Sequence, residues 1–297
     1  MKLLFLFLLT LPPLMFGCDN SIKSPAGYPV ESIIPVTKGE LPSVIPESSG
    51  LIVTQSGNIW THNDSGNSNE LFQIDSNGNL LRTLIVSNVR NIDWEDLAAD
   101  RDGNIYICDT GNNDNDRRDL AIYRIPDPDT VEGDEITALV INISYEDQKE
   151  FPPLKERRNF CVEGVVWSND SLYLFTKDRS EPLTGYTKMY AVPDKPSEYT
   201  LAPIDSLFID ENERHMRVTG ADINFKTGEM VLLTRSGILS FTNYPKGRFF
   251  EGDIKQYVFT NDIGQSEGIA FYDSKTLYIT SEEDDDGFAY IFKVKLP

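Results

Sequence analysis

Carboxylate and hydroxyl side chains recur at matching places along the chain, each one beside a small residue and a short apolar run. The side chains at these places are Ser49, Glu95, Glu163, Thr219 and Glu267. If the fold brings them together, the carboxylates repel one another in a low-dielectric site, so they keep protons, stay hydrated or bind a cation. Ca²⁺ takes roughly six to eight oxygen ligands and suits such a set better than Mg²⁺. The alternative is that the glutamates accept hydrogen bonds from backbone amides and brace the fold.

A second group carries positive charge or amide groups and follows the next apolar run of each unit. Lys177 and Arg235 are cations in a chain that has 47 acidic and 27 basic residues. Cations of this kind predict a site for an anionic group such as a phosphate or a carboxylate. We include Asn112 and Asn113 among the candidate ligand-binding residues, and the alternative for the two cations is local pairing with acids.

Candidates for proton transfer are few. His62 is one of two histidines, and Asp64 and Asp109 lie at corresponding places, so these three are the candidate catalytic residues. The alternative for His62 is a hydrogen-bonding role in a polar loop. The chain has no GxSxG, HExxH or P-loop motif, and it therefore offers no nucleophile by motif. The acidic run 282–286 does not have the spacing of an EF-hand loop and indicates a solvated turn.

These side chains belong to a repeat that must position them. Its copies start at segments 47–53, 94–99, 162–166, 219–223 and 266–270, roughly 45 to 70 residues apart. Turn residues follow each copy at 56–58, 102–104, 169–171, 227–229 and 273–275. Glycine, asparagine and aspartate in these turns are typical of tight hairpins.

The repeat predicts an all-β fold, because each turn is followed by further strand-like runs and no long stretch has a helical apolar period. Five units of four strands indicate a five-bladed β-propeller. The fifth unit lacks its outer strand, and the strand-like segment 30–37 is expected to supply it and close the ring. The alternative is six blades, with the extra blade between 114 and 160.

In this arrangement the first strands line a central channel, and each second strand returns to the same face as the start of the first. The carboxylates and the cations are therefore expected to meet at one mouth of the channel.

The N-terminal residues indicate export and lipid attachment. Residues 1–17 have the basic start and short apolar core of a signal peptide. Gly17 and Cys18 resemble the end of a bacterial lipobox, which implies cleavage before Cys18 and lipidation of that cysteine. Residues 18–27 are expected to form a tether, and residues 28–297 a single propeller domain. We expect a monomer in the bacterial cell envelope, at the outer membrane or the cell surface, held to the membrane by the lipid anchor alone.

The net charge of −20 limits the partners. Nucleic acid and bare anionic membrane repel such a chain, whereas a small anionic ligand, an envelope protein or a glycan stays compatible with it. Export also makes a disulfide between Cys108 and Cys161 feasible, and two separate buried thiols are the alternative.

The unit starts resemble those of the calcium-activated nucleotidase (apyrase) family. The matching stretches are 47–51, 95–98, 162–164, 220–225 and 267–271. This resemblance implies a five-bladed propeller with Ca²⁺ in its channel, ligated by Ser49, Glu95, Glu163 and Glu267. Ala221 stands where that family has a hydroxyl residue.

Segments 94–98, 109–113 and 175–177 resemble exported bacterial propellers of the phytase-like, gluconolactonase-like and NHL-like group. This resemblance implies the fold and the exported location.

Three functions follow from these observations. The first is a lipid-anchored envelope propeller that binds a ligand or partner at the channel mouth, with or without a central Ca²⁺. The second is a calcium-dependent hydrolase of phosphorylated or ester substrates. The third is a purely structural interaction propeller.

Overall fold

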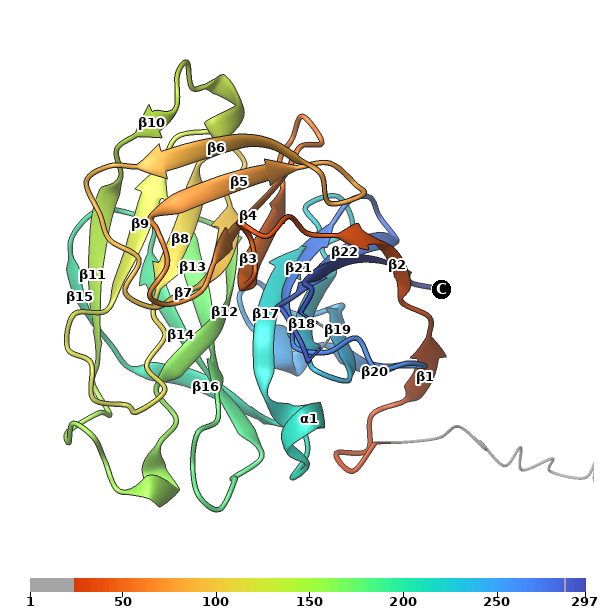
Figure 1. Ribbon diagram of the computed structural model, residues 1–297. Helices are drawn as coiled ribbons and strands as arrows, with labels where there is room; N and C mark the ends of the chain where they lie inside the picture. The colour runs from red at the N-terminus through yellow and green to blue at the C-terminus, as the bar shows by residue number, and fades with distance from the viewer. Residues whose placement is uncertain (1–23, 286) are drawn as a thin grey trace, which may run out of the picture.

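The computed structural model describes residues 24–285 and 287–297, whose strands form five sheets (Figure 1). The first strands of the sheets contact one another in the ring order β3, β7, β12, β17 and β21, and β21 contacts β3 again. The chain is therefore a five-bladed β-propeller, as the repeat predicts. The expected signal peptide and Cys18 lie outside the described residues.

Each blade is a sheet of four antiparallel strands, with the first strand next to the axis and the fourth on the outside. Blade 1 comprises β3 (Ser48–Val53), β4 (Ile59–Asn63), β5 (Glu70–Ile74) and β6 (Leu80–Val86). Blade 2 comprises β7 (Trp94–Ala99), β8 (Ile105–Asp109), β9 (Ala121–Ile125) and β11 (Leu139–Tyr145). Blade 3 comprises β12 (Cys161–Ser168), β13 (Ser171–Lys177), β14 (Tyr186–Pro193) and β16 (Pro203–Phe208). Blade 4 comprises β17 (Val218–Ile223), β18 (Met230–Thr234), β19 (Gly237–Thr242) and β20 (Asp253–Phe259). Blade 5 comprises β21 (Ser266–Phe271), β22 (Thr276–Ser281), β23 (Tyr290–Lys295) and β2 (Val36–Glu40).

An N-terminal strand closes the ring, because β2 pairs antiparallel with β23 near the C-terminus. The expected closing segment 30–37 is divided, since β1 (Val30–Ile33) pairs in parallel with β20 of blade 4 instead. Two other short strands add to outer edges in the same parallel way: β10 (Glu135–Ile136) on β6 and β15 (Glu198–Leu201) on β11.

The six-bladed alternative is wrong. The long segment 114–160 supplies the third strand β9, the edge strand β10 and the outer strand β11 of the existing blades, together with two 3₁₀ turns, η1 (Pro128–Thr130) and η2 (Lys155–Arg157). A third such turn is η3 (Phe249–Glu251), and the short helix α1 (Glu213–Met216) precedes β17. No helix in the described part of the chain is both long and apolar enough to cross a membrane.

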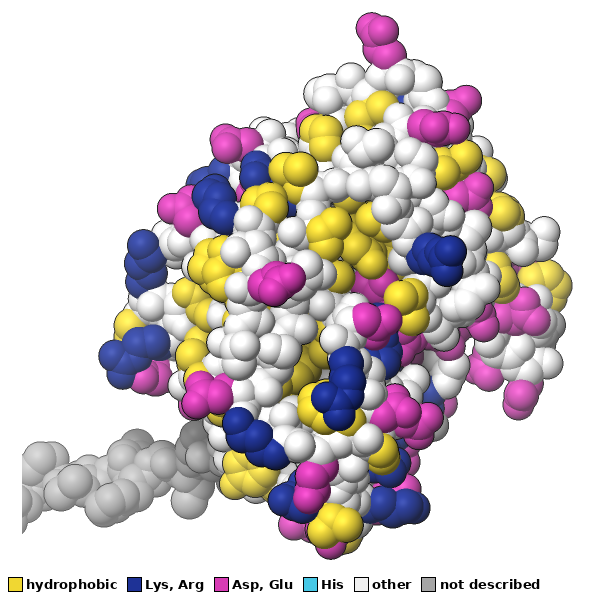
Figure 2. Space-filling model, turned by 90° about the vertical axis from the view of Figure 1, so that its left-hand side faces the viewer, with side chains coloured by type: hydrophobic (Ala, Val, Ile, Leu, Met, Phe, Trp, Pro, Cys, Tyr) yellow, Lys and Arg dark blue, Asp and Glu magenta, His cyan; other side chains and the backbone are white. Residues whose placement is uncertain are grey.

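Burial follows the position of each strand in its blade. Inner strands such as β8 and β21 are buried along their whole length, because neighbouring blades cover both of their faces. The outer strand β11 alternates between exposed and buried residues, as expected for a strand with one solvated face. On the face shown in Figure 2, acidic and basic side chains are interspersed, so the net negative charge is not gathered there into one patch.

Polar side chains tie the inner strands together near the axis. The Asp96 carboxylate accepts hydrogen bonds from the backbone N–H groups of Leu97, Val165 and Ala221, at 2.8 to 3.0 Å, and so joins blades 2, 3 and 4. The Ser49 hydroxyl donates to the carbonyl oxygen of Glu95 at 2.6 Å and links blade 1 to blade 2.

Candidate functional site

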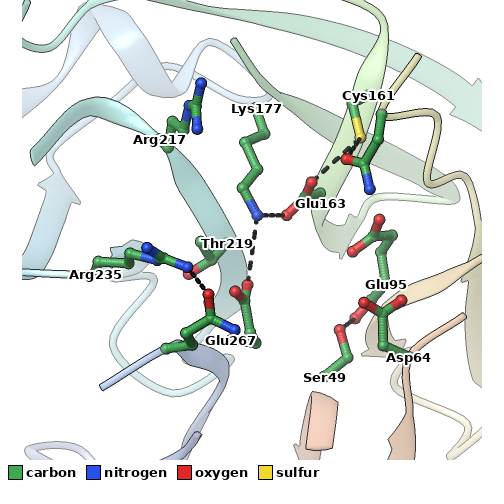
Figure 3. Close-up of polar contacts among 12 residues, drawn as sticks. Ser49, Asp64, Glu95, Cys161, Glu163, Lys177, Arg217, Thr219, Arg235 and Glu267 are labelled. Carbon is green, nitrogen blue, oxygen red and sulfur yellow. Dashed lines mark hydrogen bonds and ion pairs between the residues drawn. The ribbon is translucent and has the colours of Figure 1, made fainter. Parts of the chain in front are cut away.

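A cavity of about 180 Å³ lies at one mouth of the channel (Figure 3). Its walls come from the starts of first strands, the ends of second strands and the turns beside them. All of its lining side chains are charged or carry an amide. They are Asp64, Glu95, Asn113, Glu163, Lys177, Arg179, Glu213, Arg217, Arg235, Gln265, Glu267 and Glu282.

The centre of the cavity contains an ammonium between two carboxylates. Lys177 Nζ pairs with Glu163 and lies 3.8 Å from Glu267 Oε2, and Arg179 pairs with the other oxygen of Glu163 at 2.9 Å. Although burial alone raises the pKa of Glu163, Lys177 and Arg179 bring it below its usual value. Burial raises the pKa of Glu267 to about 8, because Lys177 offsets the loss of water only in part. Two side-chain cations therefore neutralise Glu163 at the axis, whereas Glu267 is compensated only in part.

One side of the cavity is acidic. Ligand atoms of Asp64, Asp93 and Glu95 all lie within 4.8 Å of one another. Burial, followed by repulsion from neighbouring acids, raises the pKa of Asp64 to about 7 and that of Glu95 well above its usual value. Burial also raises the pKa of Asp93 to about 6, although Arg117 opposes the shift. Glu95 is only 5% exposed, and within the described chain its carboxylate has no hydrogen-bond or ion-pair partner.

Gly111 makes this close approach of acids feasible. A Cβ atom at this position would lie 2.3 Å from both the Asp93 Cγ and the Glu95 Oε1. Only glycine leaves room there for the two carboxylates, so the loop between β8 and β9 is shaped around the acidic side.

The opposite side of the cavity is cationic (Figure 3). The Arg235 guanidinium donates to the side-chain oxygen of Gln265, and the Gln265 amide donates to Glu282. Arg217 donates to the carbonyl oxygen of Asp178 at 3.1 Å and pairs with Glu213, whose side chain is 53% exposed. Arg235 is thus a cavity cation whose hydrogen-bond partner is a neutral amide.

The predicted metal ligands lie near one another but are used in different ways. Glu95, Glu163 and Glu267 line the cavity, whereas Ser49 lies beneath it with its hydroxyl engaged by a backbone carbonyl. Thr219 also links two blades, because its hydroxyl donates to the carbonyl oxygen of Ser266 at 2.7 Å. Whether these residues bind Ca²⁺ stays a prediction.

The predicted ligand-binding residues are brought together with one exception. Lys177, Arg235 and Asn113 line the cavity. Asn112 does not line it, and its side-chain amide is used elsewhere. The oxygen accepts from Arg117 N in the same loop at 3.0 Å, and the nitrogen donates to the carbonyl oxygen of Phe160, just before β12, at 3.4 Å.

Of the predicted catalytic residues, Asp64 alone lines the cavity. His62 is completely buried, bonds the Asn63 carbonyl oxygen at 2.9 Å and packs edge-on against Trp94. Burial lowers the pKa of His62 to about 4, so the ring is neutral at pH 7, and it does not line the cavity. Asp109 is also buried, where Arg117 pairs with it at 2.8 Å and Tyr123 donates to it at 3.0 Å. Both side chains hold the fold in place.

Other residues of the cavity carry weaker sequence signals. Glu282 was expected in a solvated turn, yet it lines the cavity, and burial followed by repulsion from Asp64 raises its pKa to about 7. Its place just after β22 corresponds to those of Asp64 after β4 and Arg235 after β18, so the repeat could have identified it. Arg217 has no equivalent in the repeat, because it follows the short helix α1.

The two cysteines of the folded body do not form a disulfide. Cys108 and Cys161 are both buried and free, and burial raises the pKa of each thiol. Cys161 donates to Glu163 Oε1 at 3.2 Å, so it supports the central carboxylate.

A five-bladed propeller with a charged cavity at its channel mouth is the class of protein that these observations define. The family described as SdiA-regulated matches residues 54–288, and the chain belongs to that family. None of the curated proteins matches the chain.

Solved structures share the fold at low sequence identity. The PQQ-bound aldose sugar dehydrogenase of Streptomyces coelicolor is 12% identical, with a TM-score of 0.53 over 90% of this chain and 99% of that one. A gluconolactonase of Xanthomonas campestris, XC5397, is 14% identical, with a TM-score of 0.44 over 84% of this chain and 72% of that one. At 12% identity, the likeness to the dehydrogenase supports the propeller fold and no particular chemistry.

Proposed function

We propose that the channel mouth is the binding site of a small anionic ligand. The observation that carries this proposal is Arg235, a guanidinium on the wall of the cavity whose side-chain partner is the neutral amide of Gln265. A guanidinium presents several N–H donors in a fixed plane and binds carboxylate or phosphate oxygens in pairs. Arg217 lies on the same side and adds a second cation.

The central cation plays a different part from the one expected of it. Lys177 is engaged by Glu163 and approached by Glu267, so it has less capacity for an added anion than Arg235. We infer that Lys177 offsets the negative charge at the axis, so that it repels a bound anion less. Arg235 and Arg217 contact the ligand.

Binding is favoured over nucleophilic catalysis. Among the described residues that line the cavity, none carries a hydroxyl, thiol or imidazole group. A hydrolase at this site would have to activate water through a carboxyl group, and Asp64 and Glu282 have pKa values near 7, which suit general acid or base catalysis. That observation makes hydrolysis of a phosphorylated or ester substrate the second candidate function.

Calcium is proposed only together with that second candidate. Asp64, Asp93 and Glu95 would be its protein ligands, with water supplying the rest of roughly six to eight oxygens. Glu163 and Glu267 fit less well, because Lys177 already lies between them.

Isothermal titration calorimetry of the full chain with acetate and with inorganic phosphate tests the proposed function. Arg235→Gln is expected to weaken the binding of both anions at least tenfold. Arg101→Gln is the matched control, because Arg101 lies in the exposed turn between β7 and β8, away from the cavity. Equal affinities for the wild type and Arg235→Gln would contradict the proposal.

We also propose that the chain is a lipid-anchored monomer of the bacterial cell envelope, on the support of residues 1–18. Bacterial cells fed labelled palmitate should label the wild type and not Cys18→Ser, and labelling of both would contradict the anchor. An envelope protein or a glycan is the alternative partner, and light scattering of the purified chain tests the monomer.

A further inference from the structure

The two sides of the cavity carry opposite charge. This separation of charge indicates which group the ligand carries besides its anionic group. Arg217 and Arg235 lie on one side, and Asp64 and Glu95 lie on the other, with the Lys177–Glu163 pair between them (Figure 3). This inference rests on the proposed function, since it concerns the second half of the same ligand.

Among the described residues, no cation forms an ion pair with Asp64, Asp93 or Glu95, although Arg117 acts on Asp93 from a greater distance. The charged groups that most affect Asp64 are Asp93, Glu163 and Glu267, all of them acids. Glu95 lines the cavity and is only 5% exposed. Within the described chain, its carboxylate has no hydrogen-bond or ion-pair partner. A buried acid cluster without a cation in direct contact is unfavourable, and a bound positive group relieves the repulsion.

The central residues do not supply that charge. Lys177 forms ion pairs with Glu163 and Glu267, and Arg179 forms an ion pair with Glu163. Both cations are therefore used at the axis, and the positive group at Asp64 and Glu95 has to come from the ligand or from a metal ion.

The size of the cavity indicates how large a ligand it can enclose. A water molecule occupies roughly 30 Å³, so 180 Å³ holds about six waters, or a ligand of up to roughly ten non-hydrogen atoms. A molecule of this size that reaches both sides has its opposite charges only a few bonds apart.

We propose that the ligand is a small zwitterion of the amino-acid class, with its anionic group at Arg235 and Arg217 and its ammonium group at Asp64, Asp93 and Glu95. The ammonium donates hydrogen bonds to Asp93 and Glu95, which otherwise lack a donor within the described chain, and to Asp64, which accepts only from the Ser65 backbone N–H. The anionic group accepts from a guanidinium that otherwise contacts only an amide. Each end of the ligand thus meets a group that the protein leaves incompletely paired.

The test compares matched probes in calorimetric titrations of the full chain. The zwitterions are glycine, β-alanine and γ-aminobutyrate, whose charges are progressively farther apart. The anions that lack the ammonium are acetate, propionate and butyrate. The amines that lack the carboxylate are methylamine, ethylamine and propylamine. At least one zwitterion is expected to bind tenfold or more tightly than both of its matched probes.

Variants separate this inference from the proposed function. Arg235→Gln should weaken anions and zwitterions alike, whereas Glu95→Gln should remove the preference for the zwitterion and leave the matched anion bound. Asp102→Asn is the control, because Asp102 lies in an exposed turn outside the cavity. Circular dichroism confirms that each variant is folded before it is titrated.

Three results would overturn the inference. If anions and zwitterions bind equally and Arg235→Gln weakens both, the proposed function stands and the zwitterion fails. If Ca²⁺ brings the affinity for acetate up to that of the best zwitterion, the acidic side holds a metal ion instead of an ammonium. If no probe binds, the inference and the proposed function fail together.

Discussion

Replacing Lys177 by methionine removes the ammonium from the centre of the cavity while keeping an unbranched side chain of similar length. The side chain of Lys177 is 10% exposed, and those of Glu163 and Glu267 are 1% and 6% exposed. The change therefore leaves the buried Glu163 carboxylate without its main counter-charge. Although burial lowers the pKa of Lys177, Glu163 and Glu267 raise it above its usual value, so the group is charged at neutral pH.

The expected loss follows from the partners that remain. Removing one member of a buried ion pair costs about 3 to 5 kcal/mol, because the other charge stays buried and unpaired. Arg179 still pairs with Glu163 at 2.9 Å, so the loss should lie near the lower end, at about 3 kcal/mol. The double variant Lys177→Met, Glu267→Gln should lose less than Lys177→Met alone, because glutamine avoids the cost of keeping Glu267 protonated in the folded state at pH 7.

Urea unfolding at pH 7, followed by tryptophan fluorescence and extrapolated to water, measures these losses. Lys155→Met is the control, because Lys155 and Glu181 form an exposed pair with side chains 60% and 66% exposed. Such pairs contribute little, so the control should unfold like the wild type. A Lys177→Met protein as stable as the Lys155→Met protein would refute the account of a buried ammonium that holds the axis together.

Three further predictions concern the surroundings of the cavity. Asp96→Ala leaves buried backbone N–H groups of three blades without an acceptor, so the free energy of unfolding in urea should fall by at least about 2 kcal/mol, and a change below about 0.5 kcal/mol would contradict this role. Gly111→Ala places a Cβ against Asp93 and Glu95, so calorimetry should show weaker binding of the best zwitterion and unchanged binding of its matched anion; equal losses for both would count against it. Glu267 has a folded-state pKa of about 8, above its unfolded value, so its contribution to stability is present below about pH 4.5 and is lost as the pH rises through 8. Glu267→Gln should therefore gain stability relative to the wild type between pH 5 and pH 9 in urea titrations, and parallel pH profiles would exclude this group as the source.

The fold could be predicted because its repeat is local in sequence. Each unit carries its own small residue, apolar run and tight turn, so the number of blades followed without knowledge of long-range contacts. The N-terminal closure could be predicted only in outline. The preference of Val30–Ile33 for the edge of blade 4 depends on pairing with β20, more than 200 residues away, and no local pattern records that partner.

The sequence predicted which residues converge at the channel mouth, but not which of their side chains form ion pairs or hydrogen bonds with one another. The repeat brought Glu95, Glu163, Glu267, Lys177 and Arg235 to one mouth. The direction of each side chain depends on its neighbours in space. His62 turns into the core against Trp94, and Asp109 is taken by Arg117 of the following loop. A strand-end position predicts which face a residue occupies, whereas its partner is decided by packing between blades.

Crystals of the full chain grown in sodium bromide would test the central claim most directly, with diffraction data collected at the bromine absorption edge. The account predicts an anomalous peak inside the channel-mouth cavity, within hydrogen-bond distance of the Arg235 guanidinium. Bromide peaks confined to exposed surface cations, with none in the cavity, would contradict the assignment of this mouth as an anion-binding site.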